Sequence, residues 1–134
     1  VAMVNFLLEQ VGTSLQAIMA LGFRPIAWCI GVPWDEAGTV GMLLGEKIAL
    51  TELIAYLHLS ELMSNDAISQ RSAVIASYAL CGFANFGSIG VQIGGLSLLA
   101  PARRRDLAEL GLRAMIAGNL ACFLTACIAG MLVE

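Results

Sequence analysis

The feature that most constrains the fold is a long stretch without any charge. The segment from Ser72 to Ala100 carries no charged side chain, yet its middle, ALCGFANFGSIGVQIGGL, contains an amide at Asn85 and a hydroxyl at Ser88. The segment is longer than the roughly 20 apolar residues that one straight helix needs to cross a bilayer. Glycines cluster where it would cross, at positions 82, 87, 90, 94 and 95. We therefore expect a discontinuous transmembrane helix over residues 72–100.

The composition places the rest of the chain in lipid as well. Of the 134 residues, 59% are hydrophobic and 13% are charged, whereas soluble domains carry about 25% charged residues. The net charge is −3, and no basic face with interleaved aromatic residues is present, which argues against a nucleic-acid partner. The four cysteines form no C-x-x-C pair, so we interpret them as packing residues and expect neither disulfides nor a metal site.

The last apolar stretch, Ala114 to Val133, is uncharged over the length of a complete spanning helix. The stretch before it, PARRRDLAELGLR, is expected to form a polar turn. By the positive-inside rule the Arg103–Arg105 turn is cytoplasmic, and Glu134 then lies outside. Residues 1–30 are apolar but interrupted by Glu9 and by Phe23–Pro25, and are interpreted as the end of a spanning helix followed by an interfacial helix. Since the chain lacks an initiator Met and any signal peptide, we expect a fragment whose beginning is missing.

The segment from Gly31 to Met63 is too interrupted to cross the bilayer. Charged residues divide it into short apolar pieces, so two short helices joined at a tip between Gly45 and Thr51 fit better than one span. Thr51 is a good N-cap residue, and Glu52 falls in the first turn of the second helix, where the helix dipole favours an anion. We therefore expect a re-entrant hairpin over residues 31–63.

The interrupted hairpin and the interrupted helix follow one another in the sequence, and together they suggest one polar cavity. Unwound backbone in a membrane is tolerated only where protein or a water-filled cavity satisfies its polar groups, and secondary transporters bind substrate at such breaks. Glu52 is then either a solvated carboxylate at a helix end or a cavity group that accepts hydrogen bonds from a neutral, polyhydroxylated ligand. Asn85 and Ser88 share a face if the backbone between them is helical; they line the cavity or bond neighbouring helices. Phe83, by periodicity alone, is a packing residue.

Other classes of protein are also compatible with parts of this pattern. A membrane-embedded structural or assembly subunit would use the same polar groups only to join helices. A membrane enzyme with Glu52 and His58 as acid and base is disfavoured, because these residues are six apart and lie on different faces of a helix.

Several motifs in series carry a resemblance to a known family. GEKIALTELIAYL resembles the G-x-K-x-x-x-N-E-F-V-A-Y signature of the concentrative nucleoside transporters, and ISQRSAVIASYALCGFANFGSIGVQIGGL is similar to that family's R-S-x-x-I-x-x-Y-A-L-C-G-F-A-N-F-x-S-I-G segment. GVPW, LAPARRR and LGLRAMIAGNLACFLTACIAG resemble family stretches in the same order. The likeness covers essentially the whole chain.

The resemblance implies an all-α, polytopic membrane protein, a cation-coupled (sodium or proton) symporter of nucleosides in the plasma (inner) membrane. This chain would be its C-terminal part, and the whole protein a homotrimer with a scaffold and a mobile transport domain. The coupling cation and most nucleobase contacts would belong to the N-terminal remainder, so no cofactor or cation ligand is expected here.

Individual residues match the family's binding motifs. Glu52 corresponds to the signature glutamate that binds the ribose hydroxyls, Asn85 and Ser88 to two further ribose contacts, and Phe83 to an aromatic that packs against the nucleobase. One departure is Thr51, which stands where the signature has asparagine. Threonine keeps the ability to cap a helix but lacks the second donor of the carboxamide.

Overall fold

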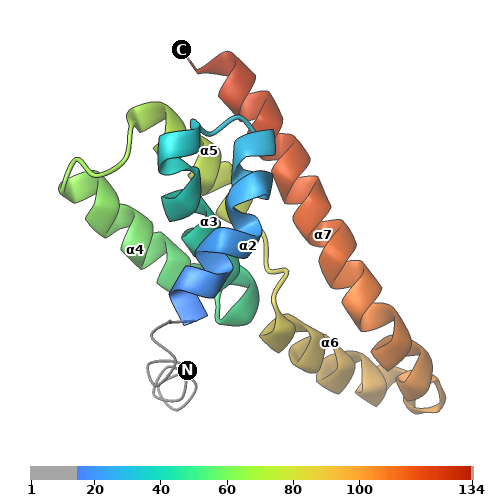
Figure 1. Cartoon of the computed structure of the whole chain (residues 1–134). Coiled ribbons are helices and arrows are strands. Elements are labelled where there is room, and N and C mark those ends of the chain that lie inside the picture. The colour runs from blue at the N-terminus through green and yellow to red at the C-terminus, as the bar shows by residue number, and fades with distance from the viewer. Residues whose placement is uncertain (1–14, 134) are drawn as a thin grey trace.

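The computed structural model describes residues 15–133, and no β-strand occurs among them. The expected all-α fold is therefore confirmed. The helices, shown in Figure 1, are α2 (Leu15–Cys29), α3 (Trp34–Ala49), α4 (Glu52–Ser64), α5 (Gln70–Leu80), α6 (Phe86–Leu99), the 3-10 helix η1 (Pro101–Arg103) and α7 (Arg104–Leu132). The beginning of the first predicted region, residues 1–14, lies outside the described part of the chain.

The first two helices form a sharply bent pair. The chain bends by 118° between α2 and α3, and Gly31 in the link between them has φ +105°. The expected interruption at Pro25 is wrong, because α2 continues through it. Proline removes one helical hydrogen bond and kinks a helix without always ending it. Gly41 lets α3 approach this helix closely, since a Cβ there would stand 2.8 Å from Arg24 N.

Helices α3 and α4 form the hairpin that the charge pattern indicates. Between them only Leu50 and Thr51 are non-helical, so the tip falls within the expected interval and Gly45 belongs to α3. The buried apolar face of α3, with Val40, Leu43 and Leu44, packs into the main core. That core is completed by Ala55 and Leu59 of α4 and by residues of α5 and α7.

The uncharged segment is broken as expected. Helix α5 ends at Leu80, α6 begins at Phe86, and the backbone between them is non-helical. Gly82 has φ +144°, a backbone conformation that residues with a Cβ rarely adopt. The glycines further on behave differently: Gly90 and Gly94, which their G-x-x-x-G spacing would place at close helix contacts, face open space in the described chain.

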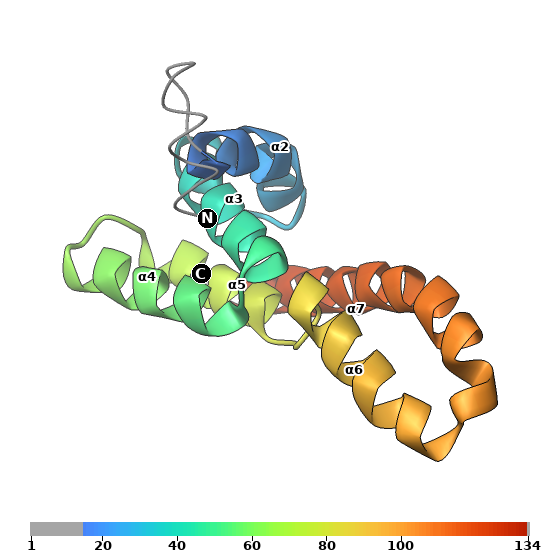
Figure 2. The ribbon, with the colours of Figure 1, turned by 90° about the horizontal axis from the view of Figure 1, so that it is seen from below.

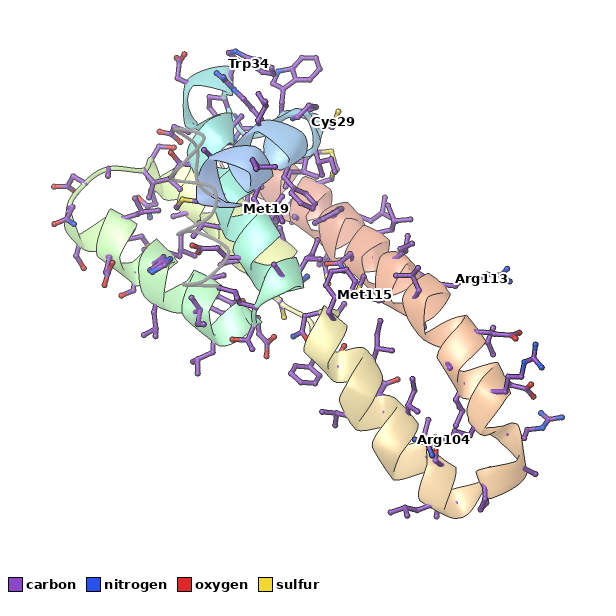
Figure 3. All side chains as sticks on the ribbon, turned by 60° about the horizontal axis from the view of Figure 1, so that its bottom comes forward. Met19, Cys29, Trp34, Arg104, Arg113 and Met115 are labelled. Atoms are coloured by element: carbon purple, nitrogen blue, oxygen red, sulfur yellow. The ribbon has the colours of Figure 1, made fainter. Side chains whose placement is uncertain are left out.

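The last helix is longer than the sequence suggested. Helix α7 begins at Arg104, so only the short stretch at η1 is a turn and the predicted polar turn up to Arg113 is wrong. It is the one helix of the described chain that is by itself long and apolar enough to cross a membrane. Helices α6 and α7 form a V with its apex at η1 (Figures 1 and 2). Trp34 and Arg104 lie at opposite ends of the molecule (Figure 3).

Candidate nucleoside-binding site

The hairpin tip and the helix break lie against each other. The amide Nδ2 of Asn85, at the end of the break, donates a hydrogen bond of 3.0 Å to Oε2 of Glu52, the first residue of α4. In Figure 1 the tip between α3 and α4 accordingly lies beside the start of α6. Glu52 is half-buried, and its Oε1 has no hydrogen-bond partner within residues 15–133. Two polar residues from separate interruptions are thus joined at one place.

Asn85 and Ser88 are brought together by a capping box. The Asn85 backbone is extended, with φ −130° and ψ 171°, so the two residues do not share a helical face. Instead Asn85 Oδ1 accepts from the backbone N–H of Ser88 at 2.7 Å, and Ser88 Oγ accepts from the backbone N–H of Asn85 at 3.2 Å. Ser88 Oγ also donates to the Asn85 carbonyl at 2.6 Å. This reciprocal capping fixes the first turn of α6.

Both side chains are buried, with Asn85 1% and Ser88 4% exposed. Asn85 still has one amide hydrogen that no described residue accepts, and the Ser88 oxygen has one lone pair beyond the bond from the Asn85 backbone. The capping arrangement therefore leaves one donor and two acceptor lone pairs, one on Asn85 Oδ1 and one on Ser88 Oγ, unused by the described residues.

Three side chains that received no site role from the sequence bind the carbonyls near the break. Lys47 Nζ donates to the Ala79 carbonyl at 3.0 Å, Cys122 Sγ to the Cys81 carbonyl at 2.8 Å, and Asn119 Nδ2 to the Ala84 carbonyl at 2.8 Å. They come from α3 and α7. Unpaired backbone groups cost several kcal/mol in hydrocarbon, so these donors stabilise the unwound segment. The sequence signals that could have identified these donors are a charge, Lys47, within the hairpin and an amide, Asn119, within the predicted spanning helix.

Phe83 projects from the break and is 55% exposed. It lines a cavity of about 400 Å³ inside the V of α6 and α7, together with Ser88, Gln92, Met115 and other, mainly apolar, residues. A volume of this size lies within the range of small-molecule sites. Phe83 and Ser88 thus line one cavity, whereas Glu52 and Asn85 are not among its lining residues.

The contacts of the remaining polar groups of the hairpin indicate roles in packing. Thr51 stands at the N-cap position of α4 with extended backbone, but its side chain makes no capping hydrogen bond. His58 pairs through Nδ1 with Glu46 Oε2 at 2.7 Å, so its partner is not Glu52. No group of three or more potential metal ligands occurs in the described residues.

Comparison with known proteins shows the family to which the chain is similar. The family described as the C-terminus of the Na+ dependent nucleoside transporters matches residues 1–130. The chain is 46% identical to mouse solute carrier family 28 member 3 over an alignment of 134 positions, which covers 90% of this chain and 19% of that protein. It is 44% identical to the putative nucleoside permease NupX of Escherichia coli over 121 residues, which are 90% of this chain and 29% of that protein.

Solved structures show the same fold. The chain superposes on CNTnw in an inward-facing substrate-bound state with a TM-score of 0.92 at 47% identity, covering 97% of this chain and 32% of that one. An outward-facing variant of the same transporter gives a TM-score of 0.91 at 44% identity, over 97% of this chain and 34% of that one. The chain thus spans about a third or less of the length of these relatives. It belongs to the concentrative nucleoside transporter family and corresponds to its C-terminal region.

Proposed function

We propose that this chain forms the ribose-binding part of a cation-coupled nucleoside symporter. The observation that carries the proposal is the junction of Glu52 with Asn85 at 3.0 Å, where two helix breaks meet. The family membership supports nucleosides as the transported substrates. The coupling cation, sodium or proton, would be held mainly by parts of the transporter outside this chain.

The chemistry of the junction suits a ribose. A carboxylate accepts hydrogen bonds at both oxygens, and Glu52 Oε1, which has no partner among the described residues, could accept from ribose hydroxyls. The remaining amide hydrogen of Asn85 and the remaining lone pair of Ser88 supply one donor and one acceptor beside it. Charge-assisted hydrogen bonds in a site of low dielectric constant are strong, and a site built for a hydroxyl rejects an analogue that lacks it. Phe83, exposed on the cavity wall, would pack against the nucleobase.

The distribution of aromatic and basic residues supports an orientation in the plasma (inner) membrane. The 29 residues of α7 correspond to about 43 Å at 1.5 Å per residue, enough to cross the hydrocarbon core. Trp28 and Trp34 pack edge to face with 6.2 Å between ring centroids, at the end opposite Arg104 (Figure 3). We propose that the arginine end is cytoplasmic and that the tryptophan end lies at the outer interface. The hairpin would then be re-entrant.

The assembly and the transport step are part of the same proposal. The family likeness suggests a homotrimer, with the remainder of each transporter completing the nucleobase and cation sites. The chain resembles CNTnw about equally well in inward-facing and outward-facing states, with TM-scores of 0.92 and 0.91. This supports alternating access by movement of largely preserved helical units.

The alternative class is a structural or assembly subunit without transport activity. Hydrogen bonds such as the one from Asn119 to the Ala84 carbonyl are those that such a subunit would use. The two functions differ in the role of Glu52: only a transporter needs its negative charge at the junction.

The test is uptake of labelled uridine and adenosine by vesicles that carry the complete transporter, with and without a sodium or proton gradient. Glu52→Gln weakens hydrogen bonds to ribose, and since hydrogen bonds to charged groups contribute about 1.5–3 kcal/mol, we expect uptake efficiency to fall by about tenfold to a hundredfold. Glu61→Gln, the same change on the exposed side of α4, should leave uptake unchanged. Equal uptake by wild type and Glu52→Gln would refute the ribose site, and absence of gradient-driven uptake would refute the transporter.

A further inference from the structure

Lys47 carries a charge into the interior of the chain. Its side chain is 0% exposed, and no carboxylate of the described residues lies within ion-pair distance of its ammonium. A buried ammonium without a carboxylate partner is unfavourable unless other groups solvate it. The group that does so is the Ala79 carbonyl, 3.0 Å away.

The position of that carbonyl explains the arrangement. Ala79 is the penultimate residue of α5, so its carbonyl belongs to the helix end, where carbonyls lack helical partners and the dipole is negative. Lys47 therefore caps the C-terminal end of α5 from the neighbouring helix α3.

Among the hydrogen bonds that connect the hairpin with the broken helix, two flank the interruptions, one on each side. The bond from Lys47 to Ala79 joins α3, before the tip, to α5, before the break. The bond from Asn85 to Glu52 joins α6, after the break, to α4, after the tip. Because both tip and break are short, fixing the first pair of helix ends limits where the second pair can lie.

We propose that Lys47 is a positioning residue of the ribose site: by holding the end of α5 against α3, it sets the separation of Glu52 from Asn85. This inference rests on the proposed function. Lys47 itself does not contact the ribose. Its loss should loosen the geometry of the hydrogen bonds to the sugar hydroxyls, and an analogue that lacks one of those hydroxyls should be less affected.

The experiment compares the KM for uridine with the KM for 3′-deoxyuridine in vesicles that carry the complete transporter. The ratio of the two KM values does not depend on the amount of folded protein, so a merely structural defect leaves it unchanged. For Lys47→Met and Lys47→Gln we expect the ratio of the deoxy to the ribo KM to fall about tenfold, the scale of one charge-assisted hydrogen bond. Tyr56→Phe is the matched control: it removes another bond from the hairpin to α5, from Tyr56 Oη to the Ser77 carbonyl at 2.7 Å, and should preserve the ratio.

An unchanged ratio in both Lys47 variants would overturn the proposal. Failure of both variants to yield folded transporter would assign Lys47 to folding and would overturn it as well. If the wild type transports uridine and 3′-deoxyuridine equally, or Glu52→Gln behaves as wild type, the proposed ribose site fails and this inference fails with it. A discriminating wild type, a defective Glu52→Gln and normal Lys47 variants would reject the positioning role alone.

Discussion

Replacing Gly82 with alanine tests whether the helix break depends on one backbone conformation. Gly82 has φ +144°, and a Cβ at this position would lie 2.6 Å from the Cys122 sulfur. Holding a residue other than glycine in such a region costs about 1–3 kcal/mol, and overpacking a tight contact costs about another 1–3 kcal/mol. Gly82→Ala should therefore destabilise the transporter by about 2–6 kcal/mol.

The two contributions can be separated with a second substitution. Cys122→Ala removes the sulfur that the new Cβ would meet, and also the bond to the Cys81 carbonyl. Measured against Cys122→Ala, the added Gly82→Ala change should therefore show only the conformational part of the loss. The assay is the thermal midpoint of the detergent-solubilised, complete transporter, recorded for the wild type, both single variants and the double variant.

Gly90→Ala is the matched control in the same segment. Gly90 lies in α6 and its Cβ would meet nothing within 4 Å of the described chain. Since alanine is favoured over glycine in a helix by about 1 kcal/mol, we expect a neutral or slightly raised midpoint. A Gly82→Ala midpoint equal to that of the wild type would refute the reasoning, because neither strain nor clash would then be present.

Two further predictions concern helix contacts, both read from the same thermal midpoint. Asn119→Leu leaves the Ala84 carbonyl without its donor, so we expect a loss of about 1–3 kcal/mol, whereas Thr125→Val, which removes a bond on the exposed side of α7, should have little effect. A normal midpoint for Asn119→Leu would contradict the role of this amide. Gly41→Ala places a Cβ 2.8 Å from backbone atoms of α2 and should be clearly destabilising, whereas Gly38→Ala, with nothing within 4 Å, should not be. Similar midpoints for these two variants would show that the close approach is unimportant.

The sequence indicates the breaks more reliably than the partners that stabilise them. The tip at Leu50 and Thr51 could be predicted because charges exclude a full span and threonine suits an N-cap, and the break near Gly82 because glycines cluster there. The donors Lys47 and Asn119 could not be assigned, since their acceptors are backbone carbonyls of other helices and leave no local pattern. Nor did the capping box stand out, because Ser88 occupies the position where glutamate or glutamine is usual.

The start of α7 was mispredicted for a different reason. The stretch after Pro101 is rich in charge, a pattern that predicts a turn, yet arginine, leucine, alanine and glutamate are good helix formers. Arg105 and Glu109 are joined across one helical turn at 3.1 Å, which supports the helix at its exposed end. Charge alone therefore does not distinguish a polar turn from the water-exposed end of a long membrane helix.

The donors that α7 supplies also have a consequence for biosynthesis. Asn119 and Cys122 follow their carbonyl acceptors by 35 and 41 residues in the chain. At a synthesis rate of about 5–20 residues per second, the break is made roughly 2–8 s before these side chains. During that interval Ala84 and Cys81 cannot have their α7 partners, so water, lipid headgroups or the insertion machinery must satisfy those carbonyls. The proposed binding site is therefore completed by the last membrane helix to enter the bilayer among those described.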